Sequence, residues 1–192
     1  MSPRSAAKRP RVARSRRLPR GAGHAASKRG PRPVGCAILT VSDTRHAATD
    51  LSGAAIERLL VRARHQVVRR AWVRDERAAI RRAARAALAR PEVDVLIVTG
   101  GSGLAPRDVT PEALAPLVER WLPGFGELFR WVSMWQVGSA AWLSRAAAGV
   151  ARGRLIVMLP GSTPAVELAM KRLILPELIH AVRMLGRFPT EE

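Results

Sequence analysis

The stretch Val93-Asp-Val-Leu-Ile-Val-Thr99, followed at once by Gly100-Gly-Ser-Gly103, decides the fold class of this 192-residue chain. Its near-continuous apolar run is typical of a parallel strand that is covered on both faces. Further strands are predicted at residues 34–42, 65–73 and 154–159, and helices at residues 51–64 and 75–89. Strands that alternate with helices indicate an α/β layer structure.

The second half of the chain is harder to interpret from local propensity. Helices are predicted to begin at Thr110, to cover residues 125–135, and to run from Ser162 or Thr163 to Leu175. Alanine content favours another helix over residues 140–150, although a strand returning into residues 154–159 is an alternative. Pro176 is expected to interrupt the last helix.

Positive charge is concentrated in the first 33 residues. The chain has 33 Lys and Arg against 15 Asp and Glu, and eleven of the basic residues lie in residues 1–33, which contain no acid. This segment has too few large apolar residues to offset its ordering entropy. We predict a disordered basic tail over residues 1–33 and one domain over residues 34–192. A solvated extension is the favoured role of the tail, and a transit peptide or a nucleic-acid-binding arm is the alternative.

Several classes of protein are disfavoured. No apolar run approaches the roughly 20 residues of a membrane span, and the tail lacks the apolar core of a secretory signal, so we expect a cytoplasmic protein. The single cysteine, Cys36, excludes a disulfide framework within one chain. The histidines lack zinc-ligand spacing, and the GxGxxG, Walker A and GxSxG motifs are absent. A nucleic-acid binder is disfavoured because no reading module is recognisable.

Polar or glycine-rich loops follow four of the predicted strands. They are residues 42–44, 74–76, 100–108 and 161–163. In open α/β sheets, ligands bind beyond the carboxyl ends of the strands, where loops expose backbone amides. Glycines directly after a buried strand let those amides approach a phosphate, because no Cβ stands in the way. We therefore favour an anion site at residues 100–103 over a simple tight turn.

Two carboxylates in these loops, Asp75 and Asp108, are candidate metal ligands. Neighbouring strands lie about 4.8 Å apart, so side chains at two strand ends could converge on one magnesium ion. The alternative is structural, since each aspartate could cap the helix or turn that follows it. The glycine-rich loop favours the metal, because magnesium in nucleotidyl transfer is usually held by one or two carboxylates together with substrate phosphates.

Six short motifs occur in order along residues 34–189. They are Thr40-Val-Ser-Asp43, Thr99-Gly-Gly-Ser-Gly103, Arg107-Asp-Val-Thr-Pro-Glu-Ala113, Pro123-Gly-Phe-Gly-Glu-Leu-Phe129, Ser144-Arg145 and Leu159-Pro-Gly-Ser-Thr163. Together they resemble the molybdenum cofactor biosynthesis family MoaB/MogA. The resemblance implies a three-layer α/β/α fold, assembly as a trimer or hexamer, and molybdopterin binding. Active members use ATP and Mg²⁺ to adenylylate molybdopterin, whereas others have lost activity, so a non-catalytic molybdopterin-binding scaffold is the alternative.

The resemblance also implies roles for individual residues. Asp75 and Asp108 match two functionally important aspartates and would hold Mg²⁺ and orient the triphosphate of ATP. Phosphate would be cradled by Gly100, Gly101, Ser102 and Gly103. The pterin or nucleotide pocket would be lined by Ser42, Asp43, Glu127, Ser144, Gly161, Ser162 and Thr163. A strand over residues 146–152 is implied as well, against the helix that alanine content favours.

The apolar segment 125–142 is rich in large side chains. Trp131 and Trp135 are four residues apart and share one helical face. We interpret them as core or subunit-contact residues, with stacking on a pterin as the less favoured alternative. Residues 134–136 depart from the family, in which acidic side chains are usual here.

Overall fold

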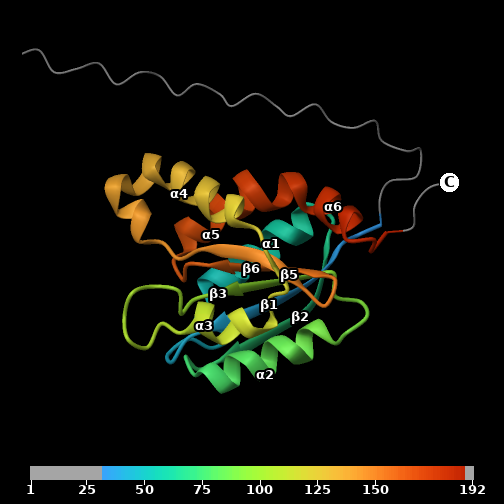
Figure 1. Ribbon diagram of the computed structural model, residues 1–192, viewed down its shortest axis with the longest axis horizontal. Coiled ribbons are helices and arrows are strands. Elements are labelled where there is room, and N and C mark those ends of the chain that lie inside the picture. Colours follow the sequence, from blue (N-terminus) through green and yellow to red (C-terminus); the bar gives the residue numbers. More distant parts are fainter. Residues whose placement is uncertain (1–31, 189–192) are drawn as a thin grey trace, which may run out of the picture. The chain divides into compact units, whose positions relative to one another are not determined.

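The computed structural model describes residues 32–188. These residues form a domain built on one six-stranded sheet (Figure 1). The strand order is β2-β1-β3-β6-β5-β4. The parallel strands are β1 (Gly35–Val41), β2 (Gln66–Val73), β3 (Val95–Thr99) and β6 (Arg154–Leu159). The remaining strands are β5 (Ala147–Ala151) and β4 (Arg120–Trp121). Because β5 runs antiparallel to both β6 and β4, the sheet is mostly but not wholly parallel.

Helices cover both faces of this sheet (Figure 1). One face carries α1 (Leu51–Arg62), α4 (Pro123–Val137), α5 (Thr163–Ala169) and α6 (Leu175–Met184). The other face carries α2 (Arg77–Leu88) and α3 (Thr110–Leu114). This three-layer α/β/α arrangement confirms the predicted fold class.

Two apolar cores flank the sheet because successive strand residues point to opposite faces. In β1, Cys36 and Ile38 belong to the core beneath α1 and α5, whereas Ala37 and Leu39 belong to the core beneath α2. Every residue of β1 is buried, and so is every residue of β3. Burial on both faces explains why these strands are continuous apolar runs in the sequence. The Cys36 thiol is part of the core, and burial, followed by the charge of Asp94, raises its pKa far above the usual range.

The prediction of a helix over residues 140–150, which rests on alanine content, is wrong. A 3₁₀ helix covers Gly138–Leu143, and β5 then pairs with β6 from Ala147 to Ala151, as the family resemblance implies. Alanine has only a small local preference, and sheet pairing with burial outweighs it. Gly149 shows how close the packing is, because a Cβ there would lie 2.5 Å from Val118 and 2.8 Å from the carbonyl oxygen of Arg120.

Pro176 does not end the last helix as predicted. The backbone continues from α5 through a π-helical segment, Met170–Ile174, into α6. At the end of the π segment, the Leu175 N–H donates to the carbonyl oxygen of Met170, five residues earlier. The wider turn places Pro176 in the first turn of α6, where its missing N–H costs no intrahelical hydrogen bond.

The predicted disordered tail lies outside the described residues, except for Arg32 and Pro33. Arg32 pairs with Asp94, so we assign it to the folded domain rather than to the tail. Within residues 32–188, no helix is long and apolar enough to span a membrane.

Candidate functional site

Four loops meet at the carboxyl edge of the parallel strands, as the sequence predicts. The loop after β1 is tied to β2 by the Ser42 amide, which donates to the carbonyl oxygen of Val73 at 2.9 Å. The loop after β3 is tied to the loop after β6 by the Thr99 hydroxyl, which donates to the carbonyl oxygen of Pro160 at 2.8 Å. These bonds hold loops that lie far apart in the chain at one end of the sheet.

The glycine loop after β3 is shaped by close backbone approach. Gly100 and Gly101 have φ angles of +97° and +61°, which side chains rarely permit. A Cβ on Gly100 would lie 2.1 Å from the carbonyl oxygen of Val41, and one on Gly101 would lie 2.6 Å from a carboxylate oxygen of Asp75. Thr110 closes the loop, because its amide donates to Gly101 O at 2.8 Å and its hydroxyl to Gly100 O at 2.9 Å. Thr110 is the first residue of α3, as predicted, and the cap position of this helix is Val109.

Three successive amides in this loop have no hydrogen-bond acceptor in the described part of the chain. They are the N–H groups of Gly101, Ser102 and Gly103. Ser102 as a whole residue is 4% exposed, and its hydroxyl donates to the carbonyl oxygen of Leu159 at 3.3 Å. Successive unpaired amides on a glycine-rich turn form a concave anion-binding site. Residues 100–103 are thus arranged to bind an anion through the backbone, while the Ser102 hydroxyl stabilises the loop.

Asp75 faces the glycine loop and does not cap α2. The cap position of α2 is Glu76, which makes no side-chain capping bond. The Asp75 carboxylate instead accepts the Val109 amide at 3.3 Å. Burial raises the pKa of Asp75, the charges of Asp108 and Asp43 raise it further, and the Val109 hydrogen bond only partly opposes them. The capping alternative is therefore wrong for Asp75. Its carboxylate forms no ion pair with another residue of the described part of the chain, although the charge of Arg107 lowers its pKa in part.

Asp108 has a structural contact of its own. Its carboxylate accepts the Ala105 amide at 3.0 Å, so it closes a turn on its N-terminal side rather than bonding to Thr110. A Cβ on Gly103 would lie 2.6 Å from the same carboxylate oxygen. Asp108 therefore combines a turn-closing role with a position directly beside the glycine loop.

Asp43 is paired with two arginines at this edge of the sheet. It accepts a hydrogen bond from Arg107 Nε at 2.8 Å, and Arg74 lies 3.7 Å away. Burial alone would raise the pKa of Asp43, but the Asp75 amide and the Arg107 guanidinium outweigh it and hold the pKa below its usual range. Asp43 thus stays ionised next to Asp75, which adds to the negative charge that Asp75 experiences.

A magnesium ion fits these residues only if the ligand supplies further oxygens. Within the described part of the chain, no group of three or more His, Cys, Asp or Glu side chains is close enough to hold a metal ion alone. The charges of Asp108 and Asp43 nevertheless act on the Asp75 carboxylate, and a cation beside Asp75 would offset them. One or two carboxylates plus phosphate oxygens is the usual environment of protein-bound Mg²⁺.

The loops after β1 and β6 are joined by residues that sequence reasoning missed. Arg45 donates to the carbonyl oxygen of Gly161 at 2.7 Å, and the Ser52 hydroxyl donates to the same oxygen at 2.7 Å. Ser52 also lies 3.2 Å from the Thr163 hydroxyl. Ser162 is the cap position of α5, and Ser42 accepts the Arg45 amide at 3.1 Å. Neither Arg45 nor Ser52 stands out by spacing, since an isolated arginine or serine has no distinctive pattern.

Beneath the β1 loop, Asp50 is a buried anchor that sequence reasoning also missed. It is 2% exposed and accepts hydrogen bonds from Thr40 at 2.7 Å, Trp72 at 3.0 Å and Arg70 at 3.2 Å. Burial would raise the pKa of Asp50, but these donors and the Gly53 amide lower it below its usual range. Asp50 therefore holds the end of β1 against β2 and stays charged.

Glu127 and Ser144 are less closely connected to the glycine loop. Glu127 is exposed on α4, and its side chain forms no hydrogen bond or ion pair with another residue of the 32–188 range. Ser144 accepts the Ala146 amide at 3.3 Å, just before β5. The structure thus does not join Glu127 to the other candidate residues, and it gives Ser144 a local contact.

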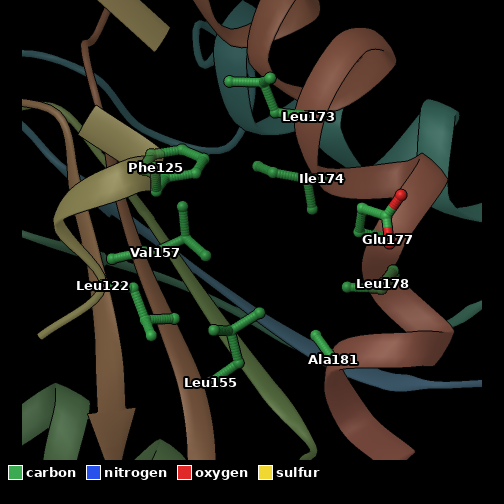
Figure 2. A pocket seen from close by; sticks show the side chains of 10 residues that line it. Leu122, Phe125, Leu155, Val157, Leu173, Ile174, Glu177, Leu178 and Ala181 are labelled. Atoms are coloured by element: carbon green, nitrogen blue, oxygen red, sulfur yellow. The ribbon is translucent and has the colours of Figure 1, made fainter. Parts of the chain in front are cut away.

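An apolar cavity of about 160 Å³ lies elsewhere, between β6 and α6 (Figure 2). Figure 2 shows Phe125, Val157 and Leu155 facing Ile174 and Leu178, with Glu177 beside them. Walls of this kind offer almost no hydrogen-bond donors to an anion. The strand-end loops, and not this cavity, are therefore the candidate functional site.

Comparison with known proteins defines the class. The profile of a family described as "Probable molybdopterin binding domain" matches residues 37–180, and the chain belongs to this family. It is 47% identical over 157 residues to Molybdenum cofactor biosynthesis protein B of Halalkalibacterium halodurans, covering 81% of this chain and 92% of that protein. The protein of the same name from Bacillus subtilis is 46% identical over 154 residues, covering 80% and 91%.

Solved structures agree with this assignment. A crystal structure of Molybdenum cofactor biosynthesis protein B is 43% identical, with a TM-score of 0.80, and the match covers 83% of this chain and 99% of that one. The molybdopterin biosynthesis enzyme MoaB from Thermus thermophilus is 36% identical, with a TM-score of 0.72 and coverage of 82% and 99%. The resemblance that the motifs indicate is confirmed, and with it the fold.

Proposed function

We propose that this protein acts in molybdenum cofactor biosynthesis by transferring the adenylyl group of ATP to molybdopterin in the presence of Mg²⁺. The observation that carries the proposal is the glycine loop, whose three unpaired amides lie beside the carboxylates of Asp75 and Asp108. Family membership and relatives named for molybdenum cofactor biosynthesis support the pathway.

In the proposed reaction, the terminal phosphate of molybdopterin attacks the α-phosphorus of ATP. A new phosphorus–oxygen bond forms as the bond to the leaving pyrophosphate breaks, and no proton needs to be removed from an ionised phosphate. The chain's part is then to position two anions and to stabilise the charge of the transition state.

The residues at the carboxyl edge suit this task. The amides of Gly101, Ser102 and Gly103 would donate to phosphate oxygens without any reorganisation. Asp75 and Asp108 would hold Mg²⁺, which when bound neutralises triphosphate charge. The loops that contain Ser42, Asp43 and residues 161–163 would form the walls of the pocket.

A turnover assay tests this proposal directly. Purified protein with molybdopterin, ATP and Mg²⁺ should release pyrophosphate and form adenylyl-molybdopterin. Asp75→Asn and Asp108→Asn should each lower turnover at least ~100-fold, the scale seen when a preorganised electrostatic contact is removed. Molybdopterin binding should survive, because the pocket also draws on distant loops.

Glu76→Gln is the matched control, because Glu76 is exposed and adjacent to Asp75. Within residues 32–188 its only ion pair is a 3.7 Å contact with Arg74. It should retain full turnover. Normal turnover in both aspartate variants would remove them from the mechanism. Molybdopterin binding without pyrophosphate release by the unaltered protein would instead favour the non-catalytic scaffold.

We further propose that the chain assembles into at least a trimer through α4 and its flanks. Large apolar side chains are exposed there, with Trp135 at 82%, Trp142 at 72% and Leu128 at 54%. Several large apolar side chains exposed on one helix and the segment after it usually mark a protein interface. Light scattering of dilute protein should give three or more chains, and Trp135→Arg should reduce that number. Val61→Arg, at an exposed apolar residue on α1, is the control, and a monomer mass for the unaltered protein would refute the assembly.

A further inference from the structure

Arg145, from a distant part of the chain, contacts both the glycine loop and the segment that leads from it to α3. It lies just before β5, and its Nη2 donates to the carbonyl oxygen of Asp108 at 2.6 Å. Its Nε donates to the carbonyl oxygen of Ser102 at 3.4 Å, and its Nη1 pairs with Glu112 on α3. One planar guanidinium therefore contacts both sides of the loop that extends from β3 to α3.

The contact with Asp108 continues through a peptide group to Asp75. The Asp108 carbonyl and the Val109 N–H belong to the same planar trans peptide, so their oxygen and hydrogen point in opposite directions. Arg145 binds the oxygen at 2.6 Å, and Asp75 accepts the N–H at 3.3 Å. Arg145 and Asp75 therefore lie at opposite ends of one peptide group.

The contact with Ser102 has the same geometry. The Ser102 carbonyl shares a peptide group with the Gly103 N–H, which is one of the three unpaired amides. With the oxygen turned toward Arg145, the N–H points away from it, toward the side where the anion would bind. A cation that donates a hydrogen bond to a carbonyl oxygen also polarises the peptide group, and this strengthens hydrogen-bond donation by the N–H of that group.

We propose that Arg145 is a positioning residue that orients the Val109 N–H toward Asp75 and the Gly103 N–H toward a phosphate of the substrate. The effect of Arg145 on turnover rests on the proposed function, whereas the effect of Arg145 on the structure of the loop does not. Arg145 itself is not a catalytic residue, because it acts through two peptide groups.

Lysine is the informative replacement at this position. It keeps the positive charge but is a point donor, and it cannot reproduce the fork that reaches two carbonyl oxygens and Glu112 together. Arg145→Lys should therefore fold, while it loosens the loop.

Arg154 offers a matched control at the opposite edge of the sheet. It also contacts three acceptors, donating to the carbonyl oxygens of Val93 at 2.8 Å, Arg152 at 2.9 Å and Arg90 at 3.2 Å. Arg154→Lys therefore removes a comparable set of contacts without touching the glycine loop. A general effect of losing an arginine fork would appear in both variants.

Hydrogen–deuterium exchange and steady-state kinetics on the full chain test the proposal. Arg145→Lys should speed exchange about 10-fold in peptides that cover residues 104–112, and it should lower kcat by about 10- to 100-fold with little change in the KM for ATP. Arg154→Lys should leave both the exchange of that segment and kcat unchanged. Glu112→Gln keeps both carbonyl contacts and should change kcat less than about 3-fold.

Two results would overturn the proposal. One is unchanged exchange in residues 104–112 of Arg145→Lys, and the other is an equal loss of kcat in the Arg145 and Arg154 variants. If the unaltered protein fails to release pyrophosphate, the proposed function fails, and the exchange contrast still decides whether Arg145 holds the loop.

Discussion

The two ends of the parallel strands hold aspartates in opposite electrostatic situations. At the amino edge, the side chain of Asp94 is fully buried and accepts hydrogen bonds from Arg32, Arg187 and the Gly35 amide, all at 3.0–3.1 Å. At the carboxyl edge, Asp75 accepts one amide hydrogen bond. Burial and then the charges of Asp108 and Asp43 raise its pKa, and the charge of Arg107 opposes them only in part. A fold that buries a carboxylate with its cations is destabilised when one partner is removed, whereas a carboxylate held near like charges is a candidate for binding a cation and its ligand.

The largest expected stability effect tests the amino edge. Asp94→Asn should lower the free energy of unfolding by about 3 kcal/mol, because it leaves two arginines near a buried site without their carboxylate. Urea unfolding measures this change. Turnover per folded molecule should be unaffected, and Glu92→Gln, which alters a neighbouring exposed acid, should leave the unfolding midpoint where it is. A loss of activity without a loss of stability in Asp94→Asn would break the comparison.

A smaller difference in stability is expected between two truncated proteins whose deletions differ by two residues. Deleting residues 1–31 should leave the melting temperature unchanged, since that segment carries no core-forming pattern. Deleting residues 1–33 also removes Arg32, which pairs with Asp94 and stacks on Phe188 with its guanidinium 4.6 Å from the ring centre. This second deletion should cost about 1 kcal/mol, because the arginine is partly exposed. Equal melting temperatures for the two truncated proteins would show that Arg187 alone suffices for Asp94.

The smallest expected effect on stability is the contribution of Asp75, which depends on pH. Its pKa is raised in the folded protein, so the folded state binds a proton that the unfolded state has already released. Its contribution to stability is therefore lost as the pH rises from the ordinary value of 3.8 through the raised pKa, and it stays lost at neutral pH.

Asp75→Asn should consequently be as stable as the unaltered protein or more stable at pH 7, within about 1 kcal/mol, and the advantage should vanish below pH 3.8. Urea titrations at two pH values measure this difference. A clearly less stable variant at neutral pH would mean that Asp75 is a structural residue like Asp94.

The strands and the glycine loop were predictable because their signals are local. The β1 and β3 segments are buried on both faces, which requires continuous apolar runs, and the ends of parallel strands necessarily share one edge. Residues 140–150 were mispredicted because alanine fits a helix and a buried strand alike, so pairing with β6 decides between them. The effect of Pro176 depends on whether the helix widens before it, which residue type alone does not specify.

The candidate site divides in the same way. The sequence by itself determined which loops form the candidate site. Glycines and polar residues that directly follow an apolar strand segment can be recognised from the local sequence alone. Only the tertiary structure decided what each charged group meets there. Asp75 reaches the Val109 amide across 34 positions, Arg145 reaches the Asp108 carbonyl across 37, and Arg187 reaches Asp94 across 93. Electrostatic partners depend on distance in space, and chain folding brings together groups whose sequence separation carries no sign of their contact.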